Sequence, residues 1–258
     1  MIGATLTLFR DAGTDTLRSF RNSLWSVPWL LFAMLLTAAA GMIFGPMGMA
    51  GGFILGAIHI GLVGWYLAQL RHAVTLRRAM TFDDVQGTAG ALFWETMSVA
   101  FVFFLAQLFL FMAPATIQAV AVLGASLLFN PVPEMIYQGR SQSVELLQDA
   151  AGFMQHNGPE WLLMHLGFTG ALVAGMVALG LAADPALIIT MLQLFGPFFG
   201  FLQAPAGVVM SLGLSPLGFV VAAVLFALTH VVMLFRGHLY KRLAGSSRRS
   251  RAWQQRMR

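Results

Sequence analysis

The sequence predicts an all-α integral membrane protein whose single domain, residues 1–258, is a bundle of six transmembrane helices arranged as three hairpins. Hydrophobic residues make up 58% of the chain and charged residues only 10%, whereas a soluble domain is about half apolar and about one quarter charged. Charge-poor runs of about 20 residues recur, which is the length that a helix needs to cross a bilayer. The arginines gather in the segments between alternate runs. Together these observations exclude a soluble or a disordered chain.

The six predicted spans are apolar runs bounded by charged residues, prolines or tryptophans. They cover 27–45, 47–70, 92–112, 114–132, 161–182 and 214–235. Pro131 and Pro133 end the fourth run, because proline lacks the N–H that a helix interior needs. The three hairpins therefore occupy 27–70, 92–132 and 161–235.

One further apolar stretch, 186–212, is long enough to cross the bilayer but is interrupted by Gly196-Pro197 and Pro205. Counting it as a seventh span would place the most basic segment of the chain on the outer side, against the distribution of positive charge. We therefore expect a re-entrant or interfacial insertion on the outer side. Protein must cover its irregular backbone, because lipid cannot satisfy exposed peptide groups.

The positive charges predict the orientation, since arginine and lysine in short loops mark the cytoplasmic side. Basic residues occur in 1–26, 71–91, 133–160 and 236–258, whereas the intervening turns hold one charged residue, Asp184. We expect both termini in the cytoplasm of a bacterium, with the chain in its inner membrane. The bacterial assignment is compositional: one lysine accompanies fourteen arginines, and alanine and glycine are abundant.

A threefold pattern accompanies the hairpins. An amphipathic stretch that ends at a tryptophan precedes each one, over 14–29, 76–94 and 143–161, and a tyrosine and an arginine follow. These positions predict interfacial helices that lie along the membrane surface. The alternative is that the tryptophans only form the aromatic belt of membrane proteins. The residues concerned are Trp29, Trp94 and Trp161; Tyr66 with Arg71, Tyr137 with Arg140, Tyr240 with Arg236; apolar Leu17, Phe20 and Leu24 opposite Arg18 and Arg21; and apolar Val144, Leu147, Ala151 and Met154.

Ionisable or polar side chains inside a membrane are costly and are candidates for function. His59, Glu95 and Gln107 are such intramembrane candidates. His165 and His230 lie at matching depths in one hairpin, which makes them candidate ligands of a metal ion or members of a proton site. A haem held by His59 and His230 would require ligands mismatched by about 9 Å in height. We therefore expect no cofactor, and the alternative for each histidine is a hydrogen bond to a neighbouring helix.

Two carboxylates lie at predicted boundaries. Glu95 begins the third span, where it would pair with Arg77 or Arg78 or interact with the helix dipole. Glu134 follows the proline break after the fourth span, where a turn is the expected structure and a transporter-like broken helix the alternative.

Two further patterns predict contacts with partners. Glycines at four-residue spacing predict close helix packing, either within the bundle or between copies of the chain. They are Gly41, Gly45, Gly48, Gly52 and Gly56. The basic tail predicts contact with anionic lipid rather than nucleic acid, because no folded nucleic-acid reader accompanies it. Its residues are Lys241, Arg242, Arg248, Arg249 and Arg251.

No phosphate-binding loop, zinc-protease motif or cysteine is present, and no polar segment is long enough for a soluble catalytic domain. We therefore expect a non-enzymatic multi-pass protein that serves as a structural, assembly or interaction component of a membrane complex. The alternative is a small transporter or channel for a hydrophobic or lipid-like substrate, based on the histidines, Gln107 and Gln118. A third hypothesis is an intramembrane protein with a histidine-ligated metal or haem.

Overall fold

The structure is a computed structural model that describes residues 2–75, 78–139, 143–178 and 216–245. Within these ranges the chain forms helices joined by short turns, with no strand, so the predicted all-α class is confirmed. The predicted insertion at 186–212 lies outside the described residues. The helices are α1 (Ile2–Asn22), α2 (Ser26–Phe44), η1 (Gly45–Met47), α3 (Gly48–Thr75), α4 (Phe82–Gly87), α5 (Phe93–Phe111), α6 (Ala115–Leu128), α7 (Val132–Gln138), α8 (Ser143–Ala178) and α11 (Pro216–Ala244).

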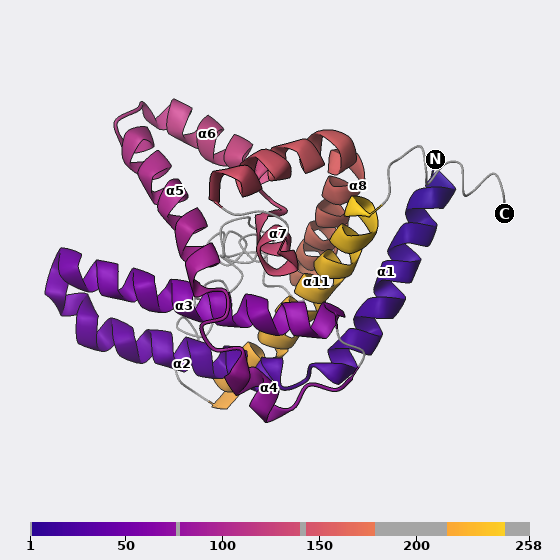
Figure 1. Ribbon diagram of the computed structural model, residues 1–258, viewed down its shortest axis with the longest axis horizontal. Coiled ribbons are helices and arrows are strands. Elements are labelled where there is room, and N and C mark those ends of the chain that lie inside the picture. The colour runs from indigo at the N-terminus through magenta and orange to yellow at the C-terminus, as the bar shows by residue number, and fades with distance from the viewer. Residues whose placement is uncertain (1, 76–77, 140–142, 179–215, 246–258) are drawn as a thin grey trace.

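Helices α2 and α3 form an antiparallel pair (Figure 1). Their turn is the single 3₁₀ turn η1, which contains Pro46, and Gly48 follows it with a φ of 60° that favours glycine. Trp29 near the start of α2 packs on Trp65 near the end of α3, with ring centroids 3.6 Å apart. The predicted runs 27–45 and 47–70 thus correspond to two packed helices.

The second unit contains α5, α6 and α7. Helix α5 matches the third predicted run. The fourth run, 114–132, is helical only as far as Leu128, where α6 ends. Helix α7 then begins at Val132, and its axis is bent by 40° from that of α6. Pro131 precedes α7 and Pro133 lies in its first turn, where a missing N–H costs little. The proline pair therefore ends one helix, as predicted, and also starts another.

The third unit departs from the predicted boundaries. The amphipathic stretch and the fifth predicted span are one continuous helix, α8, which passes through Pro159. Helix α11 continues to Ala244, eight residues beyond Arg236, where we placed the end of the last span. Arg236 has a partner inside the bundle, so its charge does not require the helix to stop there.

That the two amphipathic stretches lie along the membrane surface stays a prediction, but the structure shows which of their residues contact the bundle. Helix α1 packs along α11 (Figure 1) through small and hydroxyl side chains such as Ala12, Thr16 and Ser19, which are buried. Leu17 of α1 and Leu24 in the turn after it are 70% and 53% exposed. In α8, Leu146, Ala150 and Phe153 are buried. Of the predicted stripe, Met154 is also buried, whereas Val144 is exposed. The ring of Phe153 packs on Tyr240 of α11, so contact with the bundle decides which stripe of α8 is buried.

The helices are apolar enough for a membrane protein. In the described part of the chain, three helical stretches meet the length and hydropathy needed to cross a membrane, namely 26–75, Phe93–Phe111 and Phe219–Ala244, and the bent pair α6–α7 makes a fourth. The stretch 26–75 folds back at η1, so it supplies both helices of the first hairpin.

The core lies where α3, α7, α8 and α11 meet (Figure 1). The three tyrosines of the threefold pattern, Tyr66, Tyr137 and Tyr240, are all buried in it. The three tryptophans of that pattern do not share an environment, because Trp29 and Trp161 are buried whereas Trp94 is 75% exposed. The hairpins α2–α3 and α5–α6 diverge from this core with many exposed apolar side chains at their far ends.

Candidate functional site

An apolar cleft lies between α3, α5 and α6. Helix α5 approaches α3 closely at its start, where a Cβ on Gly64 would lie 3.0 Å from the carbonyl oxygen of Leu92. Farther along, Phe53 of α3 still meets Phe104 of α5, with ring centroids 6.2 Å apart. Helix α6 returns beside α5 after the turn at 112–114. These three helices enclose a cleft of about 670 Å³.

Small apolar side chains and phenylalanines line most of this cleft, as expected for a site that takes a hydrophobic molecule. The alanines leave the space open, and the phenylalanines supply flat apolar walls. The lining residues are Gly56, His59, Ile60, Ala100, Phe103, Phe104, Ala106, Gln107, Leu110, Phe111, Gln118, Ala121, Val122 and Ala125.

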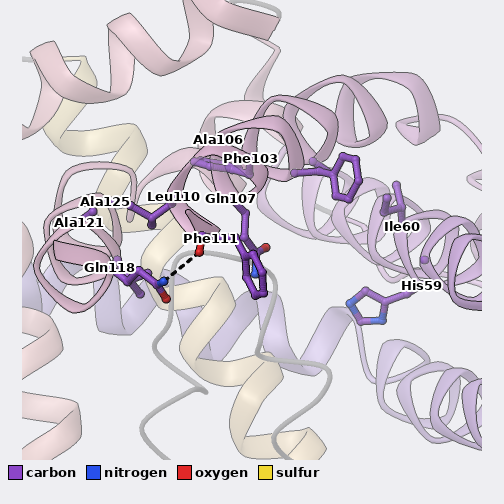
Figure 2. A pocket seen from close by; sticks show the side chains of 14 residues that line it. His59, Ile60, Phe103, Ala106, Gln107, Leu110, Phe111, Gln118, Ala121 and Ala125 are labelled. Atoms are coloured by element: carbon purple, nitrogen blue, oxygen red, sulfur yellow. Dashed lines mark hydrogen bonds between the residues drawn. The ribbon is translucent and has the colours of Figure 1, made fainter. Parts of the chain in front are cut away.

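Three polar side chains interrupt the apolar lining: His59 of α3, Gln107 of α5 and Gln118 of α6. Figure 2 shows His59 projecting into the space across from Phe111 and Gln107. The Gln118 amide nitrogen donates to the carbonyl oxygens of Phe111 and Ala113, at 3.3 and 2.8 Å. Gln118 therefore caps the C-terminal end of α5, and its amide oxygen and the other two groups can bind a ligand.

The structure thus brings together polar residues that the sequence marked separately. His59 and Gln107 were intramembrane candidates, and Gln118 joined them in the transporter hypothesis. A molecule with an apolar body and one or two hydrogen-bonding groups suits this lining, because the few polar groups would orient it. In a low-dielectric medium a polar group without a hydrogen bond is costly, so a ligand that forms hydrogen bonds with these groups would lower the free energy of the site.

A second set of polar residues is buried in the core. The guanidinium of Arg236 in α11 forms a bidentate ion pair with Glu134 in α7, with N–O distances of 2.7 and 2.9 Å, and both side chains are fully buried. Arg236 also donates to the carbonyl oxygen of Asn130, and its guanidinium lies 5.6 Å from the ring centroid of Trp161. The Trp161 indole N–H donates to the side-chain oxygen of Asn130. This network joins the break before α7 to α8 and α11.

Glu134 therefore does not lie in a boundary turn, as we expected, but in the core. Arg236 is likewise an internal residue and not a boundary charge. A buried charge is costly unless it is paired and hydrogen-bonded. Here each residue neutralises the charge of the other, although the Nη1 atom of Arg236 has no hydrogen-bond partner among the described residues. The sequence carried one signal for the pair: two lone opposite charges at the inner ends of two predicted spans.

His230 of α11 forms a bridge between α3 and the turn that joins α1 to α2. Its Nε2 atom lies 2.8 Å from the Ser23 hydroxyl and its Nδ1 atom 2.9 Å from the Tyr66 hydroxyl. Both ring nitrogens thus have protein partners. His165 instead uses Nδ1 to contact the carbonyl oxygen of Trp161 one turn before it, at 3.0 Å. None of these contacts joins His165 to His230, and no group of three or more potential metal ligands occurs among the described residues.

Glu95 lies in the first turn of α5, where the helix dipole favours a carboxylate. Arg78, one of its predicted partners, instead forms a bidentate pair with Asp84 at 2.6 and 2.8 Å, and Arg77 lies outside the described residues. Asp84 also accepts from the Thr81 N–H in a capping box that begins α4. The hydrogen bonds from Arg78 and the Thr81 backbone hold the pKa of the Asp84 carboxyl well below its ordinary value of 3.8.

The predicted glycine stripe does not mark a close contact within the chain. Among the described residues, a Cβ at Gly41, Gly45, Gly48, Gly52 or Gly56 would meet nothing within 4 Å. The close approaches occur instead at Gly51, where a Cβ would collide with the carbonyl group of Phe44, at Gly64, beside α5, and at Gly237, where it would collide with the Tyr137 hydroxyl. Packing of the stripe against a second copy or another protein stays a prediction.

The predicted lipid-contact residues divide into three groups. Lys241 is exposed. Arg242 is held by Asp15 at 2.5 Å and by Asp11 at 3.4 Å. Arg248, Arg249 and Arg251 lie outside the described residues.

Comparisons with protein-family models, curated proteins and solved structures found no match to this chain.

Proposed function

We propose that this chain is a multi-pass protein of the bacterial inner membrane that binds a lipid-like molecule in the cleft between α3, α5 and α6 and helps to move it within or across the bilayer. The observation that carries the proposal is the cleft of about 670 Å³ that collects His59, Gln107 and Gln118 on otherwise apolar walls. The proposed topology has six spans with both termini in the cytoplasm, and it rests on the positive charges of the loops.

The chemistry of the lining supports a hydrophobic ligand over an ion. Conduction of ions requires several polar or charged groups along a path, whereas this cleft has three neutral polar residues among phenylalanines and alanines. A lipid-like molecule would place its chains against Phe103 and Phe104 and its hydrogen-bonding group near His59. Exchange of such a molecule with the surrounding bilayer requires no aqueous channel.

A photoreactive lipid tests the proposal. The purified protein is reconstituted with a phospholipid that carries a diazirine in its acyl chain, irradiated and mapped by mass spectrometry. We expect labelling on the cleft faces of α3, α5 and α6. Replacing Ala121, which lines the cleft, by tryptophan should reduce this labelling several-fold, because the indole fills the space. The matched control is Ala119→Trp, at an exposed position on the same helix but outside the lining.

Equal cleft labelling in Ala121→Trp and Ala119→Trp would contradict the binding proposal. Movement of lipid is measured separately, by the exposure of a fluorescent phospholipid to an external quencher in the same vesicles. Binding without accelerated exchange between leaflets would leave a lipid-binding protein and remove the transport function.

A second candidate function is the assembly role that the sequence favours. Exposed apolar residues at the ends of the diverging hairpins support it, including Met49 at 83%, Phe111 at 81% and Met112 at 87% exposure. The open glycine stripe on α2 and α3 is suited to close approach by a partner helix. A chain that purifies from native membranes as a monomer without any stoichiometric partner would argue against this function.

A further inference from the structure

A separate polar pocket lies at the opposite end of α3, between α1, α3 and α11. Its volume is about 270 Å³. Its lining combines charged side chains with neutral hydrogen-bonding groups, and it shares no residue with the apolar cleft. The lining residues are Asp15, Arg18, Ser19, Asn22, Val74, Thr75, His238, Lys241 and Arg242.

The charges around this pocket do not cancel. Three cationic residues, Arg18, Lys241 and Arg242, face one carboxylate, Asp15. Asp15 is already occupied by Arg242, with which it forms an ion pair at 2.5 Å. No ion pair within the described chain involves Arg18 or Lys241, which are both exposed at the rim. Asp11, just outside the lining, also lies 3.4 Å from Arg242. The pocket therefore presents two cationic groups that form no ion pair within the described chain, Arg18 from α1 and Lys241 from α11.

The uncharged residues of the lining help to hold the two helices of the pocket in fixed positions. The Ser19 hydroxyl and the Nε2 atom of His238 lie 2.9 Å apart, and both side chains are buried. This contact and the Arg242–Asp15 pair hold α1 against α11, so the positions of Arg18 and Lys241 relative to each other are restricted. Asn22 adds an amide that can donate hydrogen bonds to oxygen, whereas the Thr75 hydroxyl already donates to the carbonyl oxygen of Arg71.

We propose that this pocket binds a phosphate group. Two positive charges match a phosphate that carries one or two negative charges, and a guanidinium recognises phosphate oxygens with good geometry. The pocket lies beside the last turn of α3, just before the basic loop that we predict to be cytoplasmic. At that level the phosphate belongs either to the head group of an anionic phospholipid or to a soluble phosphate compound.

Thermal unfolding of the full chain in an uncharged detergent tests the proposal, because a ligand that binds the native state raises the unfolding temperature. The probes are inorganic phosphate against chloride at equal ionic strength, and short-chain phosphatidylglycerol against phosphatidylcholine. We expect phosphatidylglycerol, inorganic phosphate or both to stabilise the native chain. The double variant Arg18→Gln with Lys241→Gln should lose this response. Arg21→Gln, an exposed arginine of α1 outside the pocket, is the matched control and should keep it.

The two sources of phosphate are separated by the probes. Stabilisation by phosphatidylglycerol alone identifies a lipid head group, whereas stabilisation by inorganic phosphate identifies a site open to soluble compounds. The conservative variant Arg18→Lys should retain part of the response, because it keeps the charge but loses the planar fork. A double variant that responds as the native chain does, or a native chain that responds to neither probe, would overturn the proposal.

Discussion

Arg236 and Glu134 are 102 residues apart in the sequence and form a bidentate ion pair in which both side chains are fully buried. The pair fixes the short helix α7 against α11 at the point where the fourth apolar run breaks. Gln138, at the end of α7, adds a hydrogen bond to the carbonyl oxygen of Gly237. Helix α7 is therefore held in the core by these polar contacts in addition to its buried apolar side chains, Val132, Met135, Ile136 and Tyr137.

Removing one partner of this pair should be strongly destabilising. We expect Arg236→Gln or Glu134→Gln to lower the free energy of unfolding by about 3–5 kcal/mol, because an uncompensated charge remains buried. Chemical or thermal unfolding in detergent measures the loss. Asp15→Asn, which breaks the partly exposed pair with Arg242, is the control and should cost about 0–1 kcal/mol.

The double variant Glu134→Met with Arg236→Met should be more stable than either charge-removing single variant, since it leaves no buried charge. A double variant less stable than both single variants would show that the pair does not account for the loss.

The His230 bridge should contribute to stability through both of its hydroxyl partners. Replacing His230 by phenylalanine removes one hydrogen-bond partner from the Tyr66 hydroxyl and one from the Ser23 hydroxyl, which still donates to the carbonyl oxygen of Ser19. Each lost hydrogen bond should cost about 0.5–1.5 kcal/mol. We expect a double-mutant cycle between Tyr66→Phe and His230→Phe to give a coupling free energy clearly different from zero. Additive losses would mean that the two side chains act independently.

Gln69 is a residue at which a substitution should stabilise the protein. Its side chain in α3 is fully buried, and neither its amide nitrogen nor its amide oxygen has a hydrogen-bond partner within the part of the chain that the structure describes. Methionine has a similar length and no strong polar group, so Gln69→Met should raise the unfolding temperature by removing an unsatisfied amide. A lower unfolding temperature would show that the amide makes a favourable polar interaction.

The Asp84 cap should respond to acid. Its pKa is lower in the folded protein than the ordinary value of 3.8, so the ionised carboxylate stabilises α4 at pH values above that value. The stabilisation should decline as the pH falls below about 4 towards the folded pKa. Hydrogen exchange of the α4 amides should therefore show less protection at pH 3 than at pH 6, after correction for the intrinsic exchange rate.

The variant Asp84→Asn should lack this pH dependence, and it should show low protection at both pH values. Asp83→Asn, at an exposed neighbouring position, is the matched control. Protection of α4 that is independent of pH in the native chain would contradict the role of the carboxylate.

The proposed topology can be tested with single cysteines, because the chain contains none. Cysteine at Gln86, before α5, should be blocked only by a reagent that enters the cell. Cysteine at Met47, in η1, or at Ala113, between α5 and α6, should react with an impermeant maleimide from the outside. Labelling of position 86 from outside, or protection of both positions 47 and 113, would reject the six-span orientation.

Local sequence properties determined which residues are helical in this protein. Apolar runs, proline positions and turn glycines predicted α2, α3, α5 and α6 to within a few residues, except where a run was broken. These features are local, because propensity and hydropathy act over one or two helical turns. They could not show that α8 continues past Pro159 or that α11 continues past Arg236.

Tertiary structure alone decided which polar residues meet. Glu134 pairs with Arg236, and His230 forms hydrogen bonds with Ser23 and Tyr66. His59 and Gln107 line the same cleft. The sequence marked most of these residues as costly inside a membrane, but their partners are more than 40 residues away. Which pairs form depends on how the helices cross, and that depends on close contacts such as Gly64 against Leu92. Hydropathy therefore predicted the apolar character of the helices and their approximate positions in the sequence. Helix packing determined which polar residues form the cleft and the buried polar network.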